Sequence, residues 1–137
     1  HDTIQNACAV IHAGWRGAVG GIIQKAVEAL EKNYGSKPSD INVSLGSCAH
    51  VCCYEVSSEF SDNLNGECCE NRGAKIFFDL PVYIQKKVVS IGISVTNINT
   101  SNSQCTICNG QFCSYRRDGD SSCRQLTVAV LRKPISL

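Results

Sequence analysis

The sequence of 137 residues contains no methionine, although it has ten cysteines and three histidines. A natural open reading frame begins with methionine, whereas this chain begins with His1 and passes directly into domain-like sequence. We therefore expect the chain to be a processed or excised piece of a longer protein.

Long apolar runs and a strong charge of either sign are also missing. No apolar run approaches the roughly 20 residues of a membrane-spanning helix, and no signal-peptide pattern opens the chain. Thirteen basic and twelve acidic residues leave a net charge of +1. This balance gives no reason to expect a nucleic-acid or membrane surface. The length is sufficient for one domain with its own core.

Cysteine is abundant instead. The ten cysteines stand at positions 8, 48, 52, 53, 68, 69, 105, 108, 113 and 123. Their even number and their density approach those of disulfide-rich secreted domains. However, this chain has long periodic segments that can bury a core, and Cys8 lies in an apolar run, where a thiol behaves as a small hydrophobe. We therefore expect mostly free thiols in a reducing, cytoplasmic setting.

The hydrophobic pattern predicts alternating strands and helices. Helices are expected over 18–33, 55–64 and 79–91, and strands over 7–11, 41–45, 76–78, 93–98 and 125–131. Gly35 is placed to end the first helix, and Asp79 is placed to cap the third. The segment 67–73 is expected to be a polar loop. No internal repeat and no linker divide the chain, so the prediction is one mixed α/β unit.

The stretch His-Ala-Gly-Trp-Arg-Gly at 12–17 lies between the first predicted strand and the first helix. Unpaired N–H groups and the helix dipole attract anions at such a turn. Arg16 adds a forked cationic donor, and His12 adds an imidazole that can bind a metal or move a proton. No phosphate-binding P-loop and no G-x-G-x-x-G motif is present. The alternative is an ordinary strand-to-helix turn with Trp15 in the core and Arg16 on the surface.

Cys105 and Cys108 have the spacing of half a zinc site. Candidates for the other half are Cys48, His50, Cys52 and Cys53. The usual second C-x-x-C is missing, so we favour local sequence variation over a metal site. A redox C-x-x-C opens a helix, and the Asn-Gly pair that follows Cys108 argues against that function.

A second basic site candidate lies at 115–118, where Tyr115, Arg116 and Arg117 precede Asp118. The residues alone favour an Arg–Asp pair in a loop. The alternative is a second anion clamp that faces Arg16.

Motifs from one end of the chain to the other occur in the same order in one known family. They lie at 12–17, 52–56 (Cys-Cys-Tyr-Glu-Val), 79–81 (Asp-Leu-Pro), 105–106 (Cys-Thr), 112–119 and 124–125 (Arg-Gln). On these residues the chain resembles the laccase-domain family, whose members are known as multicopper polyphenol oxidases and as purine nucleoside phosphorylases. The resemblance implies that residues 1–137 are the C-terminal portion of a single laccase-domain unit whose N-terminal half is missing from this chain.

For the fold, the resemblance implies an α/β domain of mixed β-sheets flanked by helices. For the cofactor, it implies zinc held by two histidines and one cysteine, with copper as the alternative. His12 matches the last of these three ligands, and the other two would lie in the missing half. Cys52 and Cys53 do not match the ligand cysteine, whose motif precedes the histidine.

For the activity, the resemblance implies zinc-dependent phosphorolysis of adenosine, inosine or methylthioadenosine, with adenosine deamination in the same pocket. The partners would be a purine nucleoside and phosphate, and the products a base and ribose 1-phosphate. Alternatives are a copper-dependent polyphenol oxidase and a non-catalytic nucleoside-binding relative. Three histidines without an H-x-H pair disfavour the oxidase. The predicted catalytic residues are His12 and Arg16, and the predicted phosphate- or substrate-binding residues are Gly14, Arg16, Gly17, Tyr115, Arg116 and Arg117.

Overall fold

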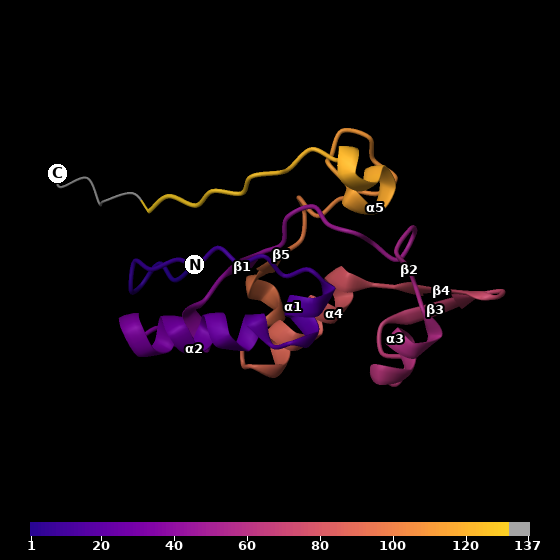
Figure 1. Cartoon of the computed structure of the whole chain (residues 1–137). Coiled ribbons are helices and arrows are strands. Elements are labelled where there is room, and N and C mark those ends of the chain that lie inside the picture. The colour runs from indigo at the N-terminus through magenta and orange to yellow at the C-terminus, as the bar shows by residue number, and fades with distance from the viewer. Residues whose placement is uncertain (132–137) are drawn as a thin grey trace.

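The structure of the protein is a computed structural model that describes residues 1–131. Its α-helices are α1 (Trp15–Val19), α2 (Ile22–Tyr34), α3 (Ser58–Asn63), α4 (Leu80–Ser90) and α5 (Tyr115–Asp118). Its strands are β1 (Val43–Ser44), β2 (Glu55–Val56), β3 (Cys69–Arg72), β4 (Lys75–Phe78) and β5 (Ile98–Asn99). Helices and small sheets alternate along the chain (Figure 1). The predicted mixed α/β fold class is therefore confirmed.

Helices α2 and α4 form the main helical pair, and both follow local sequence signals. Ile23, Val27 and Leu30 recur at the spacing of one helix face and are buried. Gly35 ends α2 in a left-handed conformation with φ 71°, which glycine adopts without steric cost. Asp79 caps α4 by accepting a hydrogen bond from the Val82 amide at 3.0 Å.

The first sheet is parallel and aligns the loops that follow its two strands. β1 pairs with β5 in parallel, and the pairing continues past the strands into a parallel bridge between Cys48 and Cys105. There the Cys48 amide donates to the Gln104 carbonyl at 3.1 Å, and the Thr106 amide donates to the Cys48 carbonyl at 2.9 Å. The loops that follow β1 and β5 therefore run side by side.

The second sheet is antiparallel in the order β2–β4–β3. β3 and β4 form a hairpin that projects at one end of the molecule, while α2 lies at the other end (Figure 1). Phe78 at the end of β4 is fully buried. Its ring contacts the rings of Phe60 on α3, Tyr83 on α4 and Tyr54 before β2, with centroid distances of 5.0, 5.5 and 6.2 Å. This aromatic cluster fixes Tyr54 against the core.

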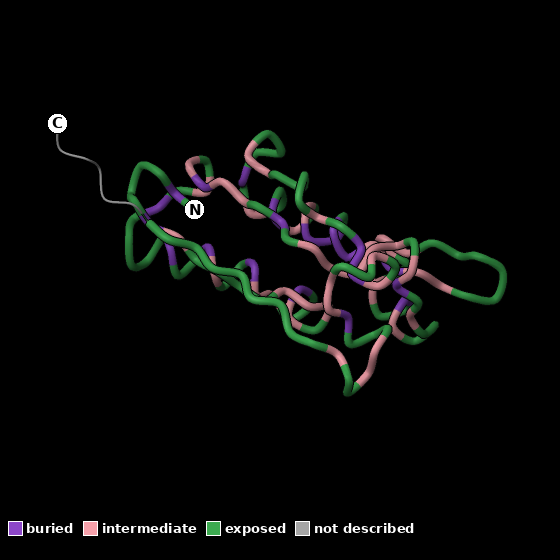
Figure 2. Tube along the Cα trace, turned by 90° about the horizontal axis from the view of Figure 1, so that it is seen from above, coloured by how far each residue is buried: buried purple, intermediate pink, exposed green. Residues whose placement is uncertain are grey.

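Buried residues lie along the interior between the helices and the sheets, whereas the hairpin tip and the segment after α5 are exposed (Figure 2). The core residues come from most of the chain: Ala7, Ala18, Ile23, Val27, Leu30, Ile41, Leu45, Tyr54, Phe78, Leu80, Tyr83, Ile84, Val88 and Ile93. Within residues 1–131, no helix combines the length and the apolar character needed to cross a membrane.

Two predicted strands are wrong. Segment 7–11 forms only an isolated bridge from Ala7 to Asp2, and Val10 and Ile11 are exposed. Segment 125–131 is extended but unpaired, and Leu126 is 87% exposed. Both have the apolar pattern of strands, but no neighbouring strand in the described part of the chain supplies the ladder that a strand requires. The expected domain also includes residues 132–137, which lie outside the described residues.

Other element boundaries also differ from the prediction. The expected helix 18–33 is divided into α1 and α2, because Gly21 adopts a left-handed conformation with φ 81°. The expected helix 55–64 begins with β2, since that segment pairs with β4. The expected loop 67–73 contains β3, which the pairing with β4 stabilises. The expected strand 93–98 is mostly a 3₁₀ turn, η2 (Val95–Asn97), capped by the Ser94 side chain.

Candidate functional site

His12 lies beside the start of α1, where two glycines leave room for it. A Cβ at Gly14 would lie 3.1 Å from His12 Nε2, and a Cβ at Gly17 would lie 3.3 Å from the His12 carbonyl oxygen. Both contacts are closer than ordinary van der Waals separation. The two glycines therefore let the His12 segment approach the helix. Because α1 has only five residues, its dipole is weaker than the one expected from a long helix.

Arg16 extends from α1 over the ring of Trp15, with its guanidinium carbon 4.4 Å from the ring centroid. Trp15 in turn packs edge-on against Phe60, with centroids 5.1 Å apart. This connects Arg16 to the aromatic cluster around Phe78. Stacking on an anchored ring limits the guanidinium to few positions while its polar edge stays available.

Arg116 lies against the ring of Tyr54, and the positive charges of both Arg16 and Arg116 act on this tyrosine. Burial raises the pKa of Tyr54, and the charge and hydrogen bonding of Arg116, together with the charge of Arg16, oppose that rise. The Arg116 guanidinium carbon lies 5.2 Å from the centroid of the Tyr54 ring. Two cationic side chains therefore lie near enough to Tyr54 for their charges to act on it, and such a region favours a phosphate or another oxyanion.

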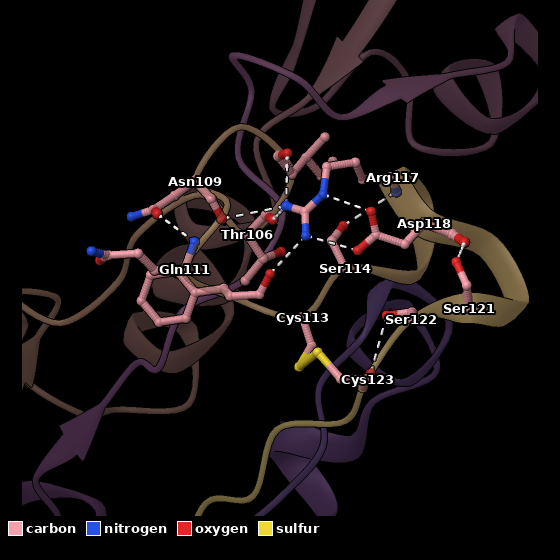
Figure 3. A network of polar contacts seen from close by, with 12 residues as sticks. Thr106, Asn109, Gln111, Cys113, Ser114, Arg117, Asp118, Ser121, Ser122 and Cys123 are labelled. Carbon is pink, nitrogen blue, oxygen red and sulfur yellow. Dashed lines mark hydrogen bonds and ion pairs between the residues drawn. A yellow bond between two sulfur atoms is a disulfide. The ribbon is translucent and has the colours of Figure 1, made fainter.

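Arg117 has a different environment from its neighbour (Figure 3). Its Nε and Nη2 atoms donate to the two carboxylate oxygens of Asp118 at 2.8 and 2.7 Å. Nη1 donates to the carbonyls of Thr106 at 2.9 Å and Ile107 at 3.2 Å, and Nη2 also donates to the Phe112 carbonyl at 2.9 Å. This guanidinium therefore holds the loop 106–112 in shape.

The Arg117 side chain also affects its acidic partner. Hydrogen bonding from Arg117 holds the pKa of Asp118 below its usual value, against the opposing effect of burial. Tyr115 is exposed, and its hydroxyl donates to Asp120 at 3.3 Å. Of the three predicted binding residues in this motif, Arg116 is the one that faces Tyr54. The assignment of Tyr115 and Arg117 to substrate binding stays a prediction.

We asked whether other potential metal ligands lie near His12, as the implied zinc ion would require. In the part of the chain that the structure describes, the one group of three or more potential metal-binding side chains does not include His12. A single imidazole does not make a zinc site, which needs at least three protein ligands. The described residues therefore do not fit a complete metal centre at His12.

A cluster of four cysteines is instead assembled from the two parallel loops. It consists of Cys52, Cys53, Cys105 and Cys108, whose sulfur atoms all lie within 4.8 Å of one another. Cys52 Sγ and Cys108 Sγ are 3.8 Å apart. Our preference for local sequence variation at these thiols overlooked the arrangement. The available signals were the C-x-x-C spacing and the adjacent Cys-Cys pair.

Two of the sequence candidates lie outside this cluster. His50 Nε2 contacts Ser103 Oγ at 3.1 Å, and Cys48 Sγ lies 3.8 Å from the same oxygen. Both side chains therefore contact the loop after β5 through Ser103.

The cluster thiols differ in acidity. Burial acts to raise the pKa of Cys105, but backbone hydrogen bonds from Cys108, His50 and Ile107 outweigh it and lower the pKa to about 6. Burial and the neighbouring thiols raise the pKa of Cys52. Amide groups directed at one sulfur favour its thiolate form.

The remaining sulfur chemistry agrees with the expectation of mostly free thiols. Eight cysteines are free within residues 1–131. Cys113 and Cys123 form a disulfide that joins the chain before α5 to the extended segment after it (Figure 3). The spacing of these two residues in the sequence did not predict that pairing.

Comparison with known proteins identifies similar chains. A family profile described as multi-copper polyphenol oxidoreductase laccase matches residues 1–132. A purine nucleoside phosphorylase of Aquifex aeolicus is 36% identical over 121 residues, which cover 88% of this chain and 55% of that protein. A purine nucleoside phosphorylase of Clostridium acetobutylicum is 31% identical over 134 residues, covering 95% of this chain and 56% of that protein.

Solved structures show the same relationship. The crystal structure of YlmD from Geobacillus stearothermophilus superposes with a TM-score of 0.69 at 30% identity, covering 77% of this chain and 42% of that chain. The chain spans about half the length of the curated relatives it matches.

Proposed function

The chain belongs to the multi-copper polyphenol oxidoreductase laccase family, and from that premise we propose that it takes part in the phosphorolysis of purine nucleosides. The relatives named purine nucleoside phosphorylase support an enzyme of this kind. We further propose that the chain is the C-terminal portion of a single catalytic domain. The observation that supports the reaction most directly is the position of Arg116 against the Tyr54 ring, together with the charge of Arg16 acting on the same tyrosine.

In phosphorolysis an oxygen of phosphate forms a bond to C1′ of the ribose while the bond from C1′ to the purine nitrogen breaks. The electron pair of that bond leaves with the purine, which takes up a proton. The nucleophile carries negative charge at neutral pH, so it needs cationic groups that hold it beside C1′. Arg16 and Arg116 would bind its oxygens, and the Tyr54 hydroxyl would supply a further hydrogen bond.

The His12 imidazole lies beside Gly14, at the start of the helix that carries Arg16. An imidazole in this position can pass a proton to the leaving purine. The family resemblance also makes His12 one ligand of a zinc ion, which would supply Lewis-acid chemistry or activate water for deamination of adenosine. Because no second ligand side chain is grouped with His12 within residues 1–131, we assign no step to a metal there. A cytoplasmic setting is part of the proposal and is supported by the eight free thiols.

Replacing Arg16 with lysine tests the anion site. Arg16→Lys keeps the charge but loses the planar fork and its stacking on Trp15, so phosphate should bind at least about tenfold more weakly. Trp15 is the single tryptophan and touches Arg16. Its fluorescence, titrated with inorganic phosphate, therefore reports on this side chain.

The matched control is Arg72→Lys, because Arg72 is an exposed arginine paired with Glu70 on the projecting hairpin. In the same titration, the Arg72→Lys chain should bind phosphate like the unaltered one. In the complete domain, Arg16→Lys should raise the KM for phosphate more than the KM for inosine. Equal phosphate affinity of the two variants would remove Arg16 from the site.

A further inference from the structure

The cysteine cluster brings together four thiols from segments that are far apart in the sequence. The three other members lie close to Cys105, which is buried, while Cys52 and Cys108 are exposed at the rim. None of the four forms a disulfide, although Cys113 and Cys123 do. The cluster therefore needs an explanation other than covalent pairing.

The sulfur spacing matches ligands of one shared ion. A disulfide requires an S–S distance of about 2.05 Å, whereas Cys52 Sγ and Cys108 Sγ are separated by 3.8 Å. In a tetrahedral zinc site, Zn–S bonds of about 2.3 Å place the sulfurs about 3.8 Å apart. The largest separation in the cluster is within 4.8 Å, so small side-chain movements would close the tetrahedron.

The backbone around the cluster is already organised. The Cys53 amide donates to the His50 carbonyl at 3.0 Å, and the Asn109 amide donates to the Cys105 carbonyl at 3.1 Å, so each cysteine pair lies in a turn. The parallel bridge between Cys48 and Cys105 fixes the two turns relative to each other. Arg117 holds the second turn through the carbonyls of residues 106 and 107.

We propose that Cys52, Cys53, Cys105 and Cys108 bind one zinc ion in a closed structural site that joins the loop before β2 to the loop after β5. A four-thiolate tetrahedron is the usual coordination of structural zinc. Sulfurs this close together suit one ion, whereas a cluster of several irons needs ligands on separate metal atoms. The thiols release their protons as the ion binds. The site is separate from His12 and does not depend on the proposed phosphorolysis.

Metal analysis of the chain purified under reducing conditions tests this proposal. We expect one zinc per chain, and the visible absorption of tetrahedral thiolate-bound cobalt when Co²⁺ replaces it. Cys53→Ser and Cys108→Ser should each lower zinc affinity by more than about a hundredfold, since removal of a ligand costs more than removal of its outer-shell partner.

Three variants serve as controls. Cys69→Ser removes a half-buried free thiol outside the cluster, Cys48→Ser removes the thiol that contacts Ser103, and His12→Ala removes the family's implied ligand. All three should keep the zinc. Loss of zinc in Cys48→Ser with retention in Cys53→Ser would contradict the assigned ligand set, and loss in His12→Ala would move the metal to the other site.

A measurement on the unaltered chain covers the case in which a serine variant fails to fold. With zinc bound, alkylation followed by mass spectrometry should modify Cys8 while the four cluster cysteines are protected, and a chelator should remove that protection. A reduced chain that carries no metal, or one that carries iron in place of zinc, would overturn the proposal. A disulfide between the two loops in place of metal would also overturn it.

Discussion

Phe78 offers the sharpest test of how the aromatic core stabilises the fold around Tyr54. Its side chain is fully buried and contacts three aromatic rings, including that of Tyr54. Phe78→Ala removes the ring at the centre of the cluster and leaves a cavity. Such substitutions cost about 3–5 kcal/mol of unfolding free energy, and each aromatic pair is worth about 0.5–1.5 kcal/mol beyond its burial. We therefore expect about 4 kcal/mol here.

Thermal and urea denaturation measure this loss. For a chain of this length, about 4 kcal/mol corresponds to a fall in Tm of roughly 10–20 °C. Phe77→Ala is the matched control, because Phe77 is the neighbouring, only half-buried residue of β4 and its ring carries the Arg72 guanidinium at 4.7 Å. An exposed cation–π contact is worth about 0.5–1 kcal/mol, so the control should lose far less. Equal losses in the two variants would refute the assignment of Phe78 to the centre of the core.

Three further predictions concern the sites. Gly14→Ala should displace the His12 imidazole, because the new Cβ would lie 3.1 Å from Nε2. Activity of the complete domain should then fall, while the Tm of the chain stays within about 2 °C. A normal rate would show that His12 tolerates displacement. Asp118 has a lowered pKa in the folded state because of Arg117, so its stabilisation is present above its unfolded pKa and is lost as pH falls through the folded pKa. Asp118→Asn should therefore lower the urea midpoint at neutral pH and flatten its acid dependence, and an unchanged pH profile would contradict the pairing. Tyr54→Phe should weaken phosphate binding in the Trp15 fluorescence titration, since the variant loses the hydroxyl on which the charges of Arg16 and Arg116 act. Unaltered affinity would exclude the hydroxyl as a ligand.

Local signals made part of the fold predictable. Helix α2 combines a regular apolar face with a glycine that ends it, and α4 begins at a capping aspartate followed by Pro81. These signals operate within one or two helical turns, so the sequence alone is sufficient to read them. Strand β3 was not predictable, because its residues are polar and only the pairing with β4 makes it a strand.

Segments 7–11 and 125–131 show the opposite error. Their apolar residues follow strand patterns, but an extended segment becomes a strand only when another segment pairs with it. The local sequence does not show whether such a partner segment exists elsewhere in the protein. The candidate site likewise depends on contacts between residues that are far apart in the sequence. Arg16 and Arg116 are recognisable as candidate anion-binding residues from their motifs, but their positions near Tyr54 depend on how α1 and α5 are placed relative to β2.

The cysteine cluster shows how the tertiary fold can complete a metal-site motif that is weak in the sequence alone. Cys105 and Cys108 supply one recognisable half of a site, whereas Cys52 and Cys53 are adjacent and lack the spacing of the other half. Only the parallel bridge between the loops brings the two pairs together.

The phosphate dependence of base release from inosine tests the central claim most directly. In the complete domain we expect hypoxanthine and ribose 1-phosphate to form in equal amounts when phosphate is present, and almost no hypoxanthine to form without it. Arg72→Lys should behave like the unaltered enzyme, whereas Arg16→Lys should require more phosphate for the same rate. Base release at the same rate without phosphate, or oxygen consumption with a phenol in place of any base release, would contradict the proposed phosphorolysis.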